Sequence, residues 1–193
     1  MQEFNERVFR IINNLSINYE GINFILIGLA EWTVQILAII LLFMWFKNRS
    51  YENRVMIISA GVTFIIAELL GKMVGMLYAN QQPFAEMSNV NLLIEKEVNN
   101  SFPSDHTIFI FSICVMFWLN NKRNLFWLVI ASAVGVSRIW VGVHYPFDVL
   151  AGAAIASITA IVVFKFPLFK NCVIKILSFY EFIEKKCLGQ RYK

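Results

Sequence analysis

Cysteine and histidine are scarce in this chain of 193 residues, which has three of the first and two of the second. Cys114, Cys172 and Cys187 are odd in number and show no CxxC spacing, so a disulfide framework is not expected. Linkers rich in proline, glycine or serine are missing, as are internal repeats and low-complexity segments. No basic patch resembles a nucleic-acid site. We therefore expect free thiols, no nucleic-acid partner, and one domain that spans residues 1–193.

Apolar side chains are what the chain has in excess. They make up 58% of the residues, with 18 phenylalanines and 5 tryptophans, and the mean hydropathy is +0.61. Such a composition is typical of a polytopic membrane protein. A transmembrane helix needs about 20 apolar residues, and the candidate runs are residues 22–46, 55–78, 107–119, 125–141 and 146–166. We expect an all-α integral membrane protein with a bundle of about five transmembrane helices between residues 22 and 166.

Both ends of the chain differ from these runs. Residues 1–20 place Phe4, Val8, Ile11 and Leu15 on one side of a helix and charged residues on the other, which is typical of a helix that lies in the membrane interface. These residues include no apolar core of the signal-peptide type, so we expect no cleaved leader. Residues 167–193 have a similar pattern and carry several basic residues. We expect an N-terminal interfacial helix and a C-terminal amphipathic basic helix.

Basic residues indicate the orientation of the bundle. In the five-span topology, 12 of the 17 lysines and arginines fall on one side of the membrane, and such an excess marks the cytoplasmic side. They are Lys47, Arg49, Arg54, Lys122, Arg123 and the seven from Lys165 to Lys193. We therefore expect a multi-pass protein with a cytoplasmic C-terminus. The extracytoplasmic face would then hold the N-terminus, residues 79–105 and the turn at residues 138–148.

Two short polar clusters interrupt the apolar runs, and they contain both histidines. One covers residues 102–107 and includes Ser104 and His106, and the other includes Arg138, His144 and Asp148. Ionisable groups so close to hydrocarbon are costly and usually functional. The third and fourth spans form a hairpin that brings both clusters to the same membrane surface. Because the third span is short, the site should lie slightly within the membrane, at the depth of a lipid phosphate.

The residue types in the two clusters suit phosphate chemistry. Backbone N–H groups at the helix start near Ser104 and His106 favour an anion, and the Arg138 guanidinium matches phosphate oxygens. His144 followed by Asp148 has the arrangement of a nucleophile or base that a carboxylate orients. This set predicts phosphoryl transfer through a covalent histidine intermediate. A zinc site is the alternative, but Arg138 and the absence of HExxH spacing argue against it, so we expect no metal and no cofactor.

The motifs Pro103-Ser104-Asp105-His106 and Ser137-Arg138-x5-His144-x3-Asp148 resemble the second and third signature motifs of the type 2 phosphatidic-acid phosphatase superfamily. The residues around them are most similar to bacterial undecaprenyl-diphosphate phosphatases of the bacitracin-resistance type. The resemblance implies that His144 attacks phosphorus, Asp148 orients His144, His106 protonates the leaving group, and Ser104 and Arg138 hold phosphate without a metal. It also implies a bacterial plasma membrane and a polyprenyl diphosphate lipid as substrate.

The first family motif is where this chain departs from the resemblance. That motif has a lysine, six residues and then Arg-Pro, whereas this chain has Gln82-Pro83, with Lys72 ten residues before Gln82. Lys72 and Gln82 are the corresponding candidates for phosphate binding. Lys72 is also four residues from Glu68, so an ion pair within the span is an equal alternative. Because charge-assisted hydrogen bonds are about twice as strong as neutral ones, Gln82 predicts weaker phosphate binding or a shifted substrate.

The resemblance leaves three alternatives for the activity. The first is hydrolysis of undecaprenyl diphosphate to undecaprenyl phosphate and phosphate at the outer face, which recycles a carrier lipid for peptidoglycan synthesis. The second is a related lipid phosphatase that acts on phosphatidylglycerol phosphate or phosphatidate. The third is a catalytically weak lipid-diphosphate binder, which Gln82 favours. The expected partners are the lipid substrate and the bilayer, and no pattern in the chain indicates an oligomeric state.

Overall fold

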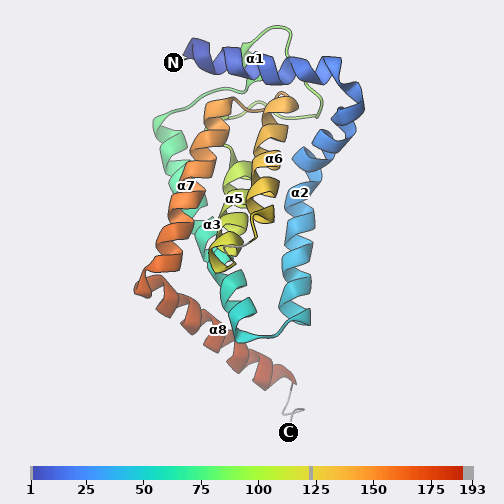
Figure 1. The fold of residues 1–193 in the computed structure, drawn as a ribbon. Coiled ribbons are helices and arrows are strands. Elements are labelled where there is room, and N and C mark those ends of the chain that lie inside the picture. The colour runs from blue at the N-terminus through green and yellow to red at the C-terminus, as the bar shows by residue number, and fades with distance from the viewer. Residues whose placement is uncertain (1, 122–123, 189–193) are drawn as a thin grey trace.

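The computed structural model describes residues 2–121 and 124–188, and every regular element in these ranges is a helix (Figure 1). The helices are α1 (Gln2–Asn18), α2 (Glu20–Lys47), α3 (Tyr51–Leu77), α4 (Pro83–Glu86), α5 (Asp105–Asn120), α6 (Phe126–Trp140), α7 (Pro146–Lys165) and α8 (Pro167–Leu188). The predicted all-α fold is confirmed.

The helices α2, α3, α5, α6 and α7 run alternately up and down as one bundle (Figure 1). Three of them, α2, α3 and α7, are long and apolar enough to cross a membrane. α5 and α6 are apolar but have only 16 and 15 residues, which is roughly 23 Å at about 1.5 Å per residue. The protein is an integral membrane protein, and each bundle helix coincides with one predicted span to within a few residues.

α5 lies at the centre of the bundle, where it packs against α3, α6 and α7. Its buried side chains surround the helix axis and include Ile110, Ile113, Met116 and Phe117. A helix that is hydrophobic on all sides is one that other elements enclose. The protein rather than lipid therefore surrounds most of α5.

α1 lies across the end of the bundle at which α2 begins and α3 ends (Figure 1). Its outward side chains Phe4, Ile11 and Ile17 are apolar and exposed, as expected for a helix in the membrane interface. Its inner face is polar, since Asn13 Nδ2 donates to the carbonyl oxygens of Asn91 (2.9 Å) and Trp140 (2.8 Å). Asparagine therefore docks α1 onto the elements below it, while the apolar side faces outward.

α8 crosses the opposite end of the bundle (Figure 1). Val173 and Leu177 are buried on its inner side, and Glu184 Oε2 accepts a hydrogen bond from Arg54 Nη1 at 3.1 Å. The predicted amphipathic C-terminal helix is thus confirmed as far as its described end. The basic residues Lys122, Arg123, Arg191 and Lys193, which entered the orientation prediction, lie outside the described residues.

The end of the bundle under α1 also holds the loop at residues 78–104 and the turn at residues 141–145. Gly142 in this turn has a φ of +89°, which glycine adopts without strain, and a Cβ there would lie 2.9 Å from the Asn91 carbonyl oxygen. The Leu93 N–H donates to the Val141 carbonyl oxygen at 3.1 Å. The loop and the turn are therefore locked together at the end where both polar clusters lie.

Candidate active site

The two polar clusters meet where α5 and α7 begin. The Ser104 N–H donates to the Asp148 carbonyl oxygen at 3.1 Å. Gly152, one turn further along α7, permits this approach, because a Cβ there would lie 2.9 Å from the Ser104 carbonyl oxygen. Ser104 and Asp148 are both buried. The structure therefore brings two distant segments of the chain into one enclosed site.

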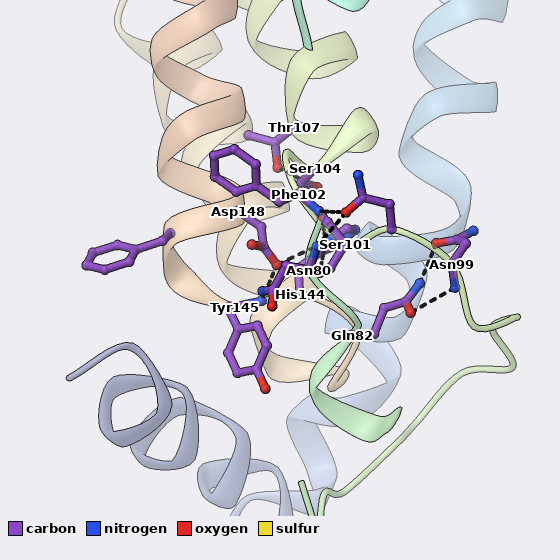
Figure 2. A network of polar contacts seen from close by, with 12 residues as sticks. Asn80, Gln82, Asn99, Ser101, Phe102, Ser104, Thr107, His144, Tyr145 and Asp148 are labelled. Carbon is purple, nitrogen blue, oxygen red and sulfur yellow. Dashed lines mark hydrogen bonds and ion pairs between the residues drawn. The ribbon is translucent and has the colours of Figure 1, made fainter. Parts of the chain in front are cut away.

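His144 lies at the centre of the site, and its Nδ1 faces three oxygen atoms (Figure 2). Nδ1 is 3.0 Å from the Ser101 carbonyl oxygen, 3.2 Å from Ser101 Oγ and 3.6 Å from Asp148 Oδ2. A carbonyl oxygen can only accept, so Nδ1 carries the proton and donates it. The other ring nitrogen, Nε2, then keeps its lone pair and can act as a nucleophile.

Two donors hold Asp148 beside the imidazole. Asp148 Oδ2 accepts from the Tyr145 N–H at 2.8 Å and from the Ser101 hydroxyl. The first of these bonds belongs to the capping box at the start of α7, so the same geometry that begins the helix also places the carboxylate. A carboxylate in this position orients the imidazole and stabilises the imidazolium that forms during nucleophilic attack.

Burial lowers the pKa of His144 below its ordinary value. The adjacent Asp148 carboxylate opposes this shift, while the positive charges of Arg138 and Lys96 reinforce it. The imidazole is therefore neutral at neutral pH, which is the state in which Nε2 can attack an electrophile.

Arg138 and His106 line a pocket of about 320 Å³ together with residues of α2 and the loop at residues 94–96. The Arg138 side chain is buried, and its Nη1 donates to the Ala30 carbonyl oxygen at 2.8 Å. Its Nε is buried and has no hydrogen-bond partner among the described residues. An unpaired buried donor is costly, and a guanidinium with such a donor can bind an anion.

Ser104 lies at the N-cap of α5 but makes no capping bond through its side chain. Its Oγ accepts from Thr107 Oγ1 at 3.1 Å, so its own O–H remains available to a ligand. The neighbouring Asp105 lines a separate pocket. In the described part of the chain, no three His, Cys, Asp or Glu side chains gather into a metal-binding group.

Lys72 and Gln82, the two other candidates for phosphate binding, do not line the pocket that holds Arg138 and His106. Lys72 lines the separate pocket, its side chain is 63% exposed, and its Nζ lies 3.5 Å from Glu68 Oε1, so the alternative ion pair within α3 is present. Gln82 is fully buried. Its Oε1 accepts from the Asn99 N–H at 3.0 Å and its Nε2 donates to Asn99 Oδ1 (Figure 2). Gln82 therefore holds the loop in place.

No role for Ser101 or Lys96 follows from the sequence patterns, yet both lie in the site. Ser101 contacts His144 and Asp148, and its position two residues before Pro103 in the second motif is a signal that could have revealed it. Lys96 lines the pocket of Arg138. It lies in a loop without periodicity, so no local pattern distinguishes it from a solvated lysine.

Curated relatives match nearly the whole chain. The sequence profile of the PAP2 superfamily matches residues 56–172. The bacitracin transport permease protein BcrC of Bacillus licheniformis is 45% identical over 192 residues, which cover 99% of this chain and 94% of that protein. The undecaprenyl-diphosphatase BcrC of Bacillus subtilis (strain 168) is 32% identical over 94% of each chain.

Two crystal structures share the fold. The structure of Aquifex aeolicus LpxE has a TM-score of 0.65 at 24% identity and covers 84% of this chain and 96% of its own. The PAP2-type phosphatidylglycerolphosphate phosphatase from Bacillus subtilis has a TM-score of 0.56 at 21% identity, covering 84% of this chain and 83% of its own. At such identities the likeness concerns the arrangement of the helices.

Proposed function

The chain belongs to the PAP2 superfamily and is a membrane lipid phosphatase, and we propose that it hydrolyses undecaprenyl diphosphate to undecaprenyl phosphate and inorganic phosphate. The observation that carries this proposal is the imidazole of His144, which Ser101 and Asp148 orient through Nδ1. The buried Arg138, with an unpaired donor, supports the binding of an anion beside it. The name of the Bacillus subtilis relative supports the choice of lipid.

In the first step, Nε2 of His144 attacks the terminal phosphorus, and the bond from that phosphorus to the bridging oxygen breaks. His106 donates a proton to the bridging oxygen, so undecaprenyl phosphate leaves. Asp148 stabilises the positive charge that the imidazole acquires. The intermediate on the enzyme is a phosphohistidine.

In the second step, water attacks the phosphohistidine while His106, now neutral, takes a proton from that water. The N–P bond breaks, inorganic phosphate leaves, and both histidines return to their starting states. Arg138, Ser104 and the first N–H groups of α5 hold the phosphoryl oxygens and stabilise the charge of the transition state. These groups need no metal and no cofactor.

We place this site on the extracytoplasmic face of the bacterial plasma membrane, with α8 in the cytoplasm. The excess of lysine and arginine at the α8 end of the bundle supports this orientation. The whole chain acts as one phosphatase domain in this proposal. In that orientation its product is the carrier lipid that peptidoglycan synthesis uses again.

Phosphate release from undecaprenyl diphosphate in detergent with excess EDTA tests the proposal. We expect release by the natural chain to survive chelation and release by His144→Ala to disappear. Ser112→Ala is the matched control, because this buried hydroxyl of α5 has no hydrogen-bond partner among the described residues, and it should keep its activity. Quenching the enzyme during turnover of lipid labelled in the terminal phosphate should trap label on the natural chain and none on His144→Ala.

The alternatives give different results in the same assay. Release from phosphatidylglycerol phosphate or phosphatidate, and none from undecaprenyl diphosphate, would assign another lipid to the same chemistry. No release from any of the three lipids by a folded protein would favour a lipid-diphosphate binder. Activity that EDTA abolishes and zinc restores would overturn the metal-free mechanism.

A further inference from the structure

Lys96 lines the pocket that holds Arg138 and His106. Its side chain is partly buried, and no ion pair joins it to another residue in the described ranges. Its charge acts on His144, whose pKa it helps to lower. The pocket therefore contains a second cation that has no carboxylate partner among the described residues.

The loop that carries Lys96 is held on both sides. Before Lys96, the Leu93 N–H donates to the Val141 carbonyl oxygen at 3.1 Å. After it, Gln82 donates to the Glu97 carbonyl oxygen at 3.3 Å and accepts from the Asn99 N–H at 3.0 Å. Gln82 thus fixes the segment next to Lys96.

The charges that line the pocket show what Lys96 contributes. Glu31 and Glu95 supply two negative charges, and Arg138 and Lys96 supply two positive charges. Without Lys96, Arg138 would be the one permanent cation of the lining against two carboxylates, and the pocket would attract an anionic headgroup less strongly. A diphosphate carries more negative charge than a monophosphate and offers a second set of oxygens to a cation.

We propose that Lys96 binds the lipid-linked phosphate of a diphosphate headgroup while Arg138 holds the terminal phosphate that His144 attacks. This inference rests on the proposed phosphatase function and names the feature that the pocket selects, which is two adjacent phosphates rather than one. A lysine ammonium is a compact charge that suits this task.

Two substitutions at Lys96 separate its charge from its shape. Lys96→Gln should lower kcat/KM for undecaprenyl diphosphate about tenfold and change kcat/KM for phosphatidate less than about threefold. Lys96→Arg keeps the charge and should recover most of the loss. Lys170→Gln removes an exposed lysine from α8, at the opposite end of the bundle, and should behave as the natural chain does.

Binding of methylenediphosphonate, whose P–C–P bridge resists hydrolysis, tests the subsite without turnover. In calorimetry, Lys96→Gln should bind it about tenfold more weakly than the natural chain does, while the affinity for orthophosphate should change less than about threefold. Unchanged affinity for methylenediphosphonate, or equal losses for both ligands, would overturn the proposal. If Lys96-dependent binding is observed and undecaprenyl diphosphate still releases no phosphate, the subsite stands and the proposed substrate fails.

Discussion

Replacing Ser101 by alanine removes one hydroxyl that contacts both His144 and Asp148. This hydroxyl donates to Asp148 Oδ2 and lies 3.2 Å from His144 Nδ1. Two other restraints remain in the variant, because the Ser101 carbonyl oxygen still accepts from Nδ1 (3.0 Å) and the Tyr145 N–H still donates to Asp148 (2.8 Å). The substitution therefore loosens the pair without removing either member.

The size of the effect follows from these contacts. A hydrogen bond to a charged group contributes about 1.5–3 kcal/mol, and about 1.4 kcal/mol is tenfold in rate. Since the two other restraints stay, we expect Ser101→Ala to lose about tenfold in kcat, at the lower end of that range. Asp148→Asn removes the charge that stabilises the imidazolium and should lose about a hundredfold or more. Ser101 is not part of the pocket that Arg138 lines, so KM should change less than about twofold.

Steady-state phosphate release in detergent gives kcat and KM for Ser101→Ala, Asp148→Asn and the double variant. Ser101→Ala removes the hydrogen bond to residue 148, and Asp148→Asn removes the charge that strengthens the same bond. The double variant should therefore lose less than the product of the two single losses. Ser112→Ala, which removes a buried hydroxyl without a partner in the described ranges, controls for the loss of a serine from the interior.

Three results would refute the positioning role of Ser101. The first is a kcat of Ser101→Ala equal to that of the natural chain, which would mean that the remaining contacts hold His144 and Asp148 by themselves. The second is a raised KM with an unchanged kcat, which would place the hydroxyl in substrate binding. The third is a double variant whose loss equals the product of the single losses, which would show that Ser101 and Asp148 act separately.

Three further predictions concern pH, the turn between α6 and α7, and α8. Because burial lowers the pKa of His144, the acid-side fall of kcat/KM for the diphosphate should have its midpoint below about pH 6.5, the value of an unperturbed imidazole. An acid-side midpoint above that value would contradict the reasoning. Gly142→Ala should lower the free energy of unfolding by about 1–2 kcal/mol, because φ is +89° and the new Cβ would press on the Asn91 carbonyl oxygen. Unfolding followed by tryptophan fluorescence measures this loss, and an unchanged free energy of unfolding would exclude the strain. Arg54 pairs with Glu184 of α8 (3.1 Å) at the end of the bundle away from His144. Arg54→Met should therefore speed proteolytic cleavage within α8 and leave phosphate release unchanged. Slower or equal cleavage would show that this pair does not hold α8 on the bundle.

Most of the bundle could be predicted because helices in a membrane follow local rules. A segment in hydrocarbon must satisfy its backbone hydrogen bonds internally, so each long apolar run forms one helix. The amphipathic patterns at the two ends likewise predicted α1 and α8. The meeting of His106 and Arg138 needed only alternating helix directions, since these decide which helix ends share a surface.

The docking of α1 on the bundle is a feature that such sequence patterns did not predict. Its apolar side predicted an interfacial helix, but the side that holds it to the protein carries Asn5, Asn13 and Ser16. Phe147 N–H donates to Asn5 Oδ1 at 3.0 Å, and Asn13 bonds to two carbonyl groups far along the chain. Hydrogen bonds from side chains to distant backbone groups leave no period in the sequence.

The sequence by itself determined the order of the five bundle helices and of the two end helices, and which helix ends carry the polar clusters, because burial imposes a pattern that repeats along each helix. Only the tertiary structure decided where Ser101, Lys96 and Gln82 lie and what they contact. These residues lie in the loop between α3 and α5, where α4 is the one short helix among the described residues. Contacts with α1, with the α6–α7 turn and across the loop itself set its path. Such contacts exist only once the helices have packed, so no local stretch of the chain encodes them.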